Sequence, residues 1–142
     1  MSRCKSLKIR KFYSKVLLVT SGVDIGLHSV IGKGVVFKHG GLGTVIHDTT
    51  VIEDNVMIMP GVLVGRSDVW LPRNESRFEK VVIKSGAVLG TGCKVLCREG
   101  VLTVGNNTII GANSVLTQST GENEIWAGIP AKKIGMRQGF EV

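Results

Sequence analysis

The hydrophobic positions of this chain recur with a period of six residues. A small or β-branched residue usually stands two positions before each of them, and glycine often follows one position after. A period of six fits neither an α-helix nor an isolated strand, so it predicts short parallel strands that are separated by turns and stacked in coils. Thirteen residues follow the rule: Ile25, Ile31, Phe37, Ile46, Ile52, Ile58, Val64, Ile83, Leu89, Val95, Val104, Ile110 and Leu116.

Three interruptions break the repeat. Two steps measure nine residues, from Phe37 to Ile46 through KHGGLG and from Val95 to Val104 through CREGVLT, and the third interruption is the polar stretch 66–80. Each coil of such a stack packs on its neighbours, so extra residues are extruded at a corner. We therefore expect loops at these three places, with the functional groups on them.

The chain of 142 residues fits a single domain, 1–142. Its repeat body spans 23–118 and carries the loop 66–80. A basic leader of helical character, 1–20, precedes the body, and the tail 119–142 forms a cap on the open end of the stack. The predicted fold class is all-β, a parallel β-helix of hexapeptide repeats.

The formal net charge is +7 and the sequence pI is about 9.6, which implies an acidic partner. With a single Tyr and no recognisable binding motif, the chain is not expected to bind nucleic acid. A phosphorylated small molecule or an anionic membrane surface fits the charge better. For the basic leader, a solvated helix is the default interpretation, and peripheral contact with the inner face of a membrane is the alternative.

The cysteines and the N-terminus favour a cytoplasmic protein. Cys4, Cys93 and Cys97 are odd in number and lack the paired spacing of a zinc site, so we expect reduced thiols and no metal. The longest apolar run near the N-terminus, 16–19, is shorter than the roughly 7 to 15 residues of a signal-peptide core.

Several blocks of the repeat resemble the hexapeptide-repeat acyltransferases: IGKGVV, VIEDNVMI, VLGTGCKV, TIIGANSVL and WAGIPAKKIG. The resemblance covers about 23–135. It is greatest to the serine acetyltransferases and to the small O-acetyltransferases of surface-polysaccharide biosynthesis. It implies a left-handed parallel β-helix, a homotrimer, and an acyltransferase that uses acetyl-coenzyme A as acyl donor.

The same resemblance assigns the general base to His39, in the element KHGGLGTVIH. The chemistry requires such a group, because a hydroxyl is almost un-ionised at neutral pH. An imidazole, with an ordinary pKa near 6.5, can take its proton as the oxygen attacks a thioester carbonyl. The other two histidines are expected to have no catalytic role. We interpret His28 as a surface or corner residue and His47 as a structural or interface residue.

Acetyl-coenzyme A is an acidic ligand, and in the family it runs beside hexads rich in small residues and ends at a basic tail. The resemblance implies that Lys132 is the first candidate phosphate ligand, ahead of Lys133. The full set of expected donor-binding residues is Gly90, Thr91, Gly92, Gly111, Ala112, Lys132 and Lys133.

Three positions depart from the serine acetyltransferase pattern. Lys38 stands where that family has Asp before the catalytic His, and Glu79 and Lys80 stand where it has Arg-His. Those groups would recognise an amino acid, so we expect a different acceptor, a hydroxyl of a sugar or of a surface-polysaccharide precursor. The expected substrate-binding residues are Lys38, Trp70, Arg73 and Arg77.

Other functions remain open. One is serine O-acetylation itself, and another is a non-catalytic β-helical assembly protein. A zinc hydratase on the same scaffold would need three converging histidines, and the spacing of the three in this chain does not match that family.

Overall fold

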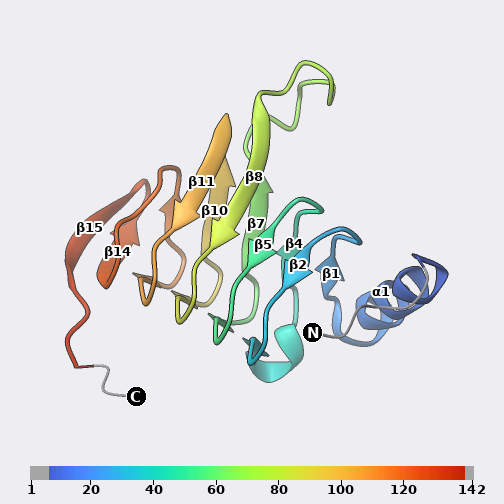
Figure 1. The fold of residues 1–142 in the computed structure, drawn as a ribbon, viewed down its shortest axis with the longest axis horizontal. Coiled ribbons are helices and arrows are strands. Elements are labelled where there is room, and N and C mark those ends of the chain that lie inside the picture. Colours follow the sequence, from blue (N-terminus) through green and yellow to red (C-terminus); the bar gives the residue numbers. More distant parts are fainter. Residues whose placement is uncertain (1–6, 140–142) are drawn as a thin grey trace.

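A computed structural model describes residues 7–139. They form a left-handed parallel β-helix with a triangular cross-section, preceded by one helix and closed by a β-hairpin (Figure 1). Sheet A contains β1 (Asp24–Ile25), β4 (Val45–Ile46), β7 (Leu63–Arg66), β10 (Lys94–Cys97) and β13 (Val115–Leu116). Sheet B contains β2 (Val30–Ile31), β5 (Val51–Ile52), β8 (Phe78–Ile83) and β11 (Gly100–Val104). Sheet C contains β3 (Val36–Phe37), β6 (Met57–Ile58), β9 (Val88–Leu89), β12 (Ile109–Ile110), β14 (Glu124–Gly128) and β15 (Ala131–Met136).

The predicted period of six is confirmed strand by strand, because each repeat residue lies on a short strand that pairs in parallel with the coil above or below. In the inner coils the repeat side chains fill the axis of the prism; Ile83 and Leu89, for example, are fully buried. Ile31 has the same phase but is 42% exposed, because it lies in the first coil and has no coil beneath it. The hydrophobic effect therefore acts along the axis, and the two ends must be covered separately.

The described part of the predicted leader lies in a helix, α1 (Leu7–Ser21), beside β1 at the uncapped end (Figure 1). Positions 1–6 of the leader lie outside the described residues. Arg10 donates a hydrogen bond to the Ser29 carbonyl at 3.2 Å, and Ser14 donates to the Ile25 carbonyl at 3.4 Å. The helix buries none of its residues and leaves apolar side chains such as Phe12 exposed. Within 7–139, no helix is long and apolar enough to cross a bilayer.

The second nine-residue step does not extrude a loop, so that prediction is wrong. The additional residues lengthen β10 and β11, which continue their ladders beyond the ordinary two-residue strands: Cys97 pairs with Arg66, and Gly100 pairs with Phe78. Both partners lie at the base of the insertion 66–80. Backbone groups there need hydrogen-bond partners, and the longer step provides them for the base of the projecting loop.

The C-terminal cap begins as one more strand of the β-helix. β14 pairs in parallel with β12, and β15 then folds back antiparallel along β14. Trp126 on β14 is buried, and its indole N–H donates to Glu124 at 2.8 Å. Packing in the cap is therefore the observed role of this tryptophan.

Candidate functional site

The turns that lead from sheet C to sheet A form one edge of the prism, which we call the C–A corner. The loop 38–44 follows β3 there, 59–62 follows β6, 90–93 follows β9 and 111–114 follows β12. His39 and the small residues predicted to bind the acyl donor therefore lie on one edge. Coils in a parallel stack are about 4.8 Å apart, which puts Thr91 about 10 Å and Ala112 about 14 Å along the corner from the His39 loop.

Backbone, rather than side chains, forms the surface of much of this corner. A Cβ added to Gly43 would lie 3.8 Å from the Gly61 Cα, and one added to Gly61 would lie 3.5 Å from the Gly92 Cα. Hydrogen bonds link successive turns, from Gly61 N–H to the Leu42 carbonyl at 2.9 Å and from Gly92 N–H to the Pro60 carbonyl at 2.9 Å. A ligand could therefore approach the backbone closely over several coils.

The predicted donor-binding residues divide into two kinds. Thr91 and Ala112 are exposed on the corner and can meet a ligand directly. Gly90 has a packing role, because its Cβ would lie 2.6 Å from the Ile110 carbonyl oxygen of the next coil. Gly111 is similarly close to Ala127, at 3.1 Å from its Cβ.

His39 has a left-handed backbone conformation, with φ 52° and ψ 38°. The other described non-glycine residues with positive φ are all asparagines, the residue type that tolerates this region well. Gly41 allows the loop to pack closely on Val23, since a Cβ on Gly41 would lie 3.1 Å from Val23 Cγ2. Gly40 faces open space. The loop thus holds an exposed imidazole in a conformation that costs energy, a frequent property of functional residues.

Asp24 also lies at this corner, and our sequence prediction missed it. It is exposed at the start of β1, pairs with Val45 of β4, and its N–H donates to the Thr44 carbonyl at 2.9 Å. Because the loop 38–44 leads directly into β4, Asp24 belongs to the same end of the C–A corner as His39. Counting hexads would have found it, since it immediately precedes the repeat residue Ile25.

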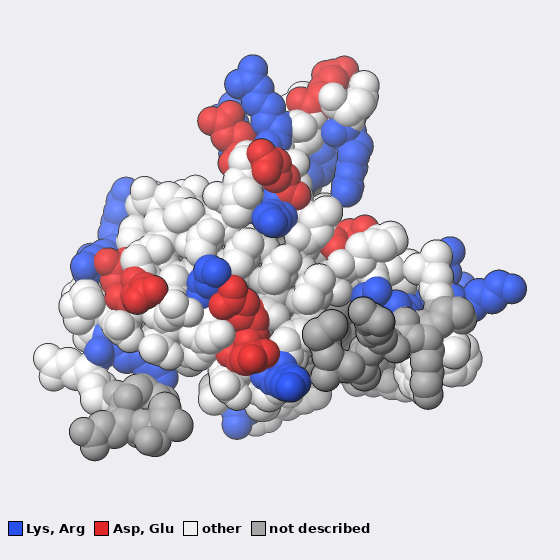
Figure 2. Space-filling view, in the orientation of Figure 1, with Lys and Arg blue, Asp and Glu red and all other residues white. Residues whose placement is uncertain are grey.

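The insertion 66–80 projects from a different edge, the A–B corner, where the chain turns from sheet A to sheet B (Figure 1). It carries Trp70, which is 72% exposed, together with Arg73 and Arg77. Figure 2 shows this projection carrying charges of both signs. Within one chain, these three predicted substrate-binding residues are not brought to His39; Lys38 alone of that set adjoins it.

A polar cluster that the sequence prediction missed lies at the base of this insertion. The His47 ring contacts Phe78 edge to face, with 4.9 Å between ring centroids, and its Nε2 lies 3.4 Å from Arg73 Nη1. Its Nδ1 lies 3.3 Å from Thr49 Oγ1, which donates to the Glu79 carbonyl at 2.9 Å. Burial, and then the nearby Arg73 cation, lower the pKa of His47 below 6.5, so the ring is neutral at neutral pH. No short-range pattern in the sequence links positions 47 and 73.

The two tail lysines on β15 differ in their surroundings. Lys133 Nζ lies 2.8 Å from Glu124 Oε1, in an ion pair whose carboxylate also accepts from Trp126. Lys132 is exposed, and no carboxylate of the described residues pairs with it. Lys132 is thus the better placed to meet an anionic ligand.

The contacts of Glu124 with Lys133 and Trp126 predict that the fold loses stability in acid. Lys133 and then the Trp126 indole lower the pKa of Glu124 from 4.5 to about 2. A depressed carboxyl pKa stabilises the fold above pH 4.5, and this contribution is lost as the pH falls toward 2. We expect Glu124→Gln to lower the melting temperature at pH 7, with a difference from the parent protein that shrinks at pH 3. Glu75→Gln, which alters an exposed loop carboxylate, is the control; a difference independent of pH would contradict this account.

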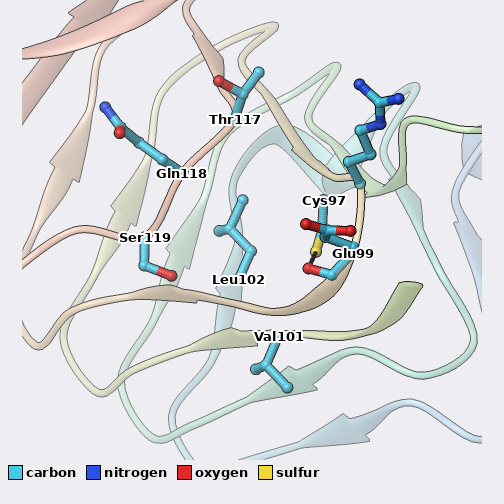
Figure 3. A pocket seen from close by; sticks show the side chains of 8 residues that line it. Cys97, Glu99, Val101, Leu102, Thr117, Gln118 and Ser119 are labelled. Carbon is cyan, nitrogen blue, oxygen red and sulfur yellow. Dashed lines mark hydrogen bonds between the residues drawn. The ribbon is translucent and has the colours of Figure 1, made fainter. Parts of the chain in front are cut away.

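A pocket of about 330 Å³ lies farther along the A–B corner, between the turns that follow β10 and β13 (Figure 3). Its lining includes Cys97, Glu99, Leu102, Thr117 and Ser119. Burial raises the pKa of the Cys97 thiol, so this cysteine is a poor nucleophile. The pocket has no histidine in its lining and lies on a different corner from His39.

The histidines do not gather into a metal centre in the part of the chain that the structure describes. His28 Nδ1 lies 2.6 Å from Asp48 Oδ2, in an exposed pair on the A–B corner. Hydrogen bonds from His28 lower the pKa of Asp48, that from its backbone N–H most strongly. Residues 7–139 contain no group of three or more His, Cys, Asp and Glu side chains that could hold an ion.

Comparison with known proteins gives a consistent set of relatives. The chain is 34% identical over 128 residues to the serine acetyltransferase of Haemophilus influenzae, which covers 90% of this chain and 44% of that protein. A solved serine acetyltransferase in complex with cysteine has a TM-score of 0.78 at 30% identity, covering 92% of this chain and 48% of the other. One in complex with CoA has a TM-score of 0.74 at 30% identity, covering 89% and 48%. No family model matches the chain, which spans less than half the length of these relatives.

Proposed function

Because the chain belongs to the serine acetyltransferase-like hexapeptide-repeat proteins, we propose that it transfers acetyl from acetyl-coenzyme A to a hydroxyl group. One observation carries the proposal. The C–A corner carries an exposed imidazole in a left-handed turn and a surface formed largely by backbone. Lys132 lies beside this corner, because it pairs with Ala127, which is close to Gly111, and no carboxylate of the described residues pairs with it. The imidazole can serve as the general base, the backbone surface can bind the arm of a thioester donor, and the lysine can bind the phosphates of that donor.

In the proposed reaction, His39 removes the proton of the acceptor hydroxyl while the oxygen forms a bond to the thioester carbonyl carbon. The carbon–sulfur bond breaks, and the leaving thiolate receives the proton from the imidazolium, so that protons and charges balance. Such general base catalysis contributes about 10² to 10⁴ in rate. Asp24, at the same end of the corner, is the candidate carboxylate for orienting the imidazole, a role that recurs beside catalytic histidines.

Serine is the acceptor that the relatives favour, since those compared above are serine acetyltransferases. It therefore has better support than the sugar acceptor that we expected from Lys38, Glu79 and Lys80. The sugar hydroxyl remains a second candidate because of Trp70, whose exposed ring on a projecting loop could stack on a sugar. A role in polysaccharide biosynthesis has no support beyond that.

The separation of the two corners bears on assembly. His39 is on the C–A corner and the insertion 66–80 is on the A–B corner, so one chain does not bring them together. We propose a homotrimer in which the loop of one copy approaches His39 of the next. The motive for this arrangement is that the two elements lie on different corners of one chain.

Thioester consumption measured with L-serine and with a panel of sugars would test the activity and the acceptor. We expect CoA release that depends on a hydroxyl acceptor. A non-catalytic assembly protein would instead ignore acetyl-coenzyme A. The melting temperature of such a protein would not change when acetyl-coenzyme A is added. A protein that binds acetyl-coenzyme A would be stabilised by about 2.7 kcal/mol at a ligand concentration of 100 times the dissociation constant.

The tail lysines make a separate prediction. Replacing Lys132 by Ala is expected to raise KM for acetyl-coenzyme A about fivefold, which corresponds to one exposed charged contact of about 1 kcal/mol. Lys133→Ala should instead lower the melting temperature, because it leaves Glu124 without its cation. Steady-state kinetics and thermal melts on both variants check this, and an equal KM effect from the two would contradict it.

A further inference from the structure

The helix α1 turns its polar side toward the β-helix. Arg10 and Ser14 donate hydrogen bonds to the carbonyls of Ser29 and Ile25, which belong to the first coil. These two donors are four positions apart, so they lie on one side of the helix, and both are half-buried. A helix of a soluble protein usually packs its apolar side on the core and turns its polar side to water. The orientation of α1 is the reverse.

An apolar stripe runs along the opposite side of the helix and faces away from the stack. Its members, Ile9, Phe12, Val16 and Val19, have the spacing of three and four residues that places side chains on one helix face. At 100° per residue, the stripe is centred about 160° around the helix from the side that contacts the first coil. Phe12 is 65% exposed and Val19 is 85% exposed, so no part of 7–139 covers the stripe.

The charges beside the stripe all have one sign. Lys8, Lys11 and Lys15 lie along one flank of it and are exposed. The helix, LKIRKFYSKVLLVTS, contains no Asp or Glu. Each lysine can lay its aliphatic stem along the stripe and extend its ammonium group outward. An apolar stripe bordered by lysines is typical of a helix that lies in the interface of an anionic bilayer.

We propose that α1 docks the protein on an anionic lipid bilayer. The helix axis lies in the plane of the surface, the stripe enters the boundary of the acyl chains, and the three lysines meet the headgroup phosphates. Charge argues against a second copy of the chain as the occupant, because two such faces would bring together the lysines of both copies with no carboxylate from either helix.

The position of α1 fixes which end of the molecule meets the bilayer. The helix lies at one end of the stack and the hairpin of β14 and β15 lies at the other (Figure 1). The first coil, which leads into the His39 loop, is therefore nearest the bilayer, and the cap is farthest from it. The docking itself is independent of the proposed acetyl transfer.

Sedimentation of the full chain with vesicles measures the electrostatic part. We expect binding to vesicles of equal parts phosphatidylcholine and phosphatidylglycerol, and much weaker binding to phosphatidylcholine alone. Replacing Lys8, Lys11 and Lys15 by Gln should weaken binding about fivefold per lysine, or ~1 kcal/mol each. The control removes three exposed cations from the β-helix instead and should bind as the parent does: Lys80→Gln, Lys94→Gln and Arg98→Gln.

The apolar part has its own variant. Phe12→Gln should weaken binding to the mixed vesicles by about tenfold or more, because an aromatic side chain no longer leaves water. Ile134→Gln is the matched control, since Ile134 is 66% exposed, as Phe12 is 65%, but lies on β15 at the other end of the molecule. Both side chains are exposed, so thermal melts should show no loss of stability in either variant.

Insertion of the stripe, as distinct from adhesion of a basic surface, has a spectroscopic signature. Phe12→Trp should shift its fluorescence emission to shorter wavelength when the mixed vesicles are added, because the indole enters an apolar environment. Ile134→Trp should show no such shift. Trp70 and Trp126 are present in both variants and contribute the same background.

The proposal is wrong if the parent does not bind the mixed vesicles, or if the lysine and Phe12→Gln variants bind them as well as the parent does. Sedimentation velocity without lipid tests the other occupant: a smaller assembly for Phe12→Gln, with no vesicle binding by the parent, would make the stripe a contact between copies. These measurements need no acetyl-coenzyme A and no acceptor. Acetyl transfer can therefore fail while the docking stands, and the docking can fail while acetyl transfer stands.

Discussion

Replacing His39 by Ala is expected to lower kcat/KM for acetyl transfer by about 10² to 10⁴, the range typical of a general base. The acceptor hydroxyl would then have to lose its proton to water. Because His39 is exposed, the loss should come without a lower melting temperature. Stopped or continuous assays of CoA release give kcat/KM, and thermal melts give the melting temperature. A loss smaller than about tenfold would remove His39 from this role.

The backbone offers a sharper version of this experiment. Asn occupies the other described left-handed non-glycine positions, so His39→Asn keeps the turn and removes only the imidazole. It should be as inactive as His39→Ala. His28→Asn is the control, because His28 lies on another corner and pairs with Asp48. If Asp24 orients the imidazole, Asp24→Asn should lower kcat in the parent and have no further effect in the His39→Ala background.

Filling the exposed backbone surface is the second large effect. Ala112→Phe is expected to raise KM for acetyl-coenzyme A by at least about tenfold, or ~1.4 kcal/mol, because the ring would cover the backbone that the donor needs. Ala112 is exposed, and the left-handed position of its turn is Asn113 rather than Ala112 itself, so the fold should tolerate the change. Initial rates over a range of donor concentrations give the value.

A matched substitution guards against a general effect of an added aromatic ring. Lys33 is exposed on the corner between sheets B and C, away from the His39 edge, and Lys33→Phe should leave KM unchanged. Similar KM increases in the two variants would show that the C–A corner is not the donor site.

The regular part of the molecule was predictable because six residues make one strand and one turn, and three such units make one coil. From that count, His39, Thr91 and Ala112 fall on one corner, and the structure places them there. The exposure of Ile31 was not predictable from its phase, since phase says which way a side chain points and nothing about whether another coil covers it.

The interruptions were predicted less well, for a physical reason. The spacing from Val95 to Val104 shows extra residues, and only the neighbouring coils decide whether these leave the body or lengthen strands. The contact of His47 with Arg73 spans 26 positions and depends on how a loop folds back over its own base. Side-chain contacts of that kind leave no periodic trace in the sequence.

The two ends of the C–A corner differ in how well the β-helix beneath them is covered. Its His39 end rests on the first coil, where Ile31 and Val36 are partly open to solvent, and its other end is closed by the antiparallel pair β14 and β15. Coils of a solenoid touch only the coils beside them. A donor molecule lying along the corner would contact several coils at once. Its binding would therefore stabilise the first coil together with the coils near the end that β14 and β15 close.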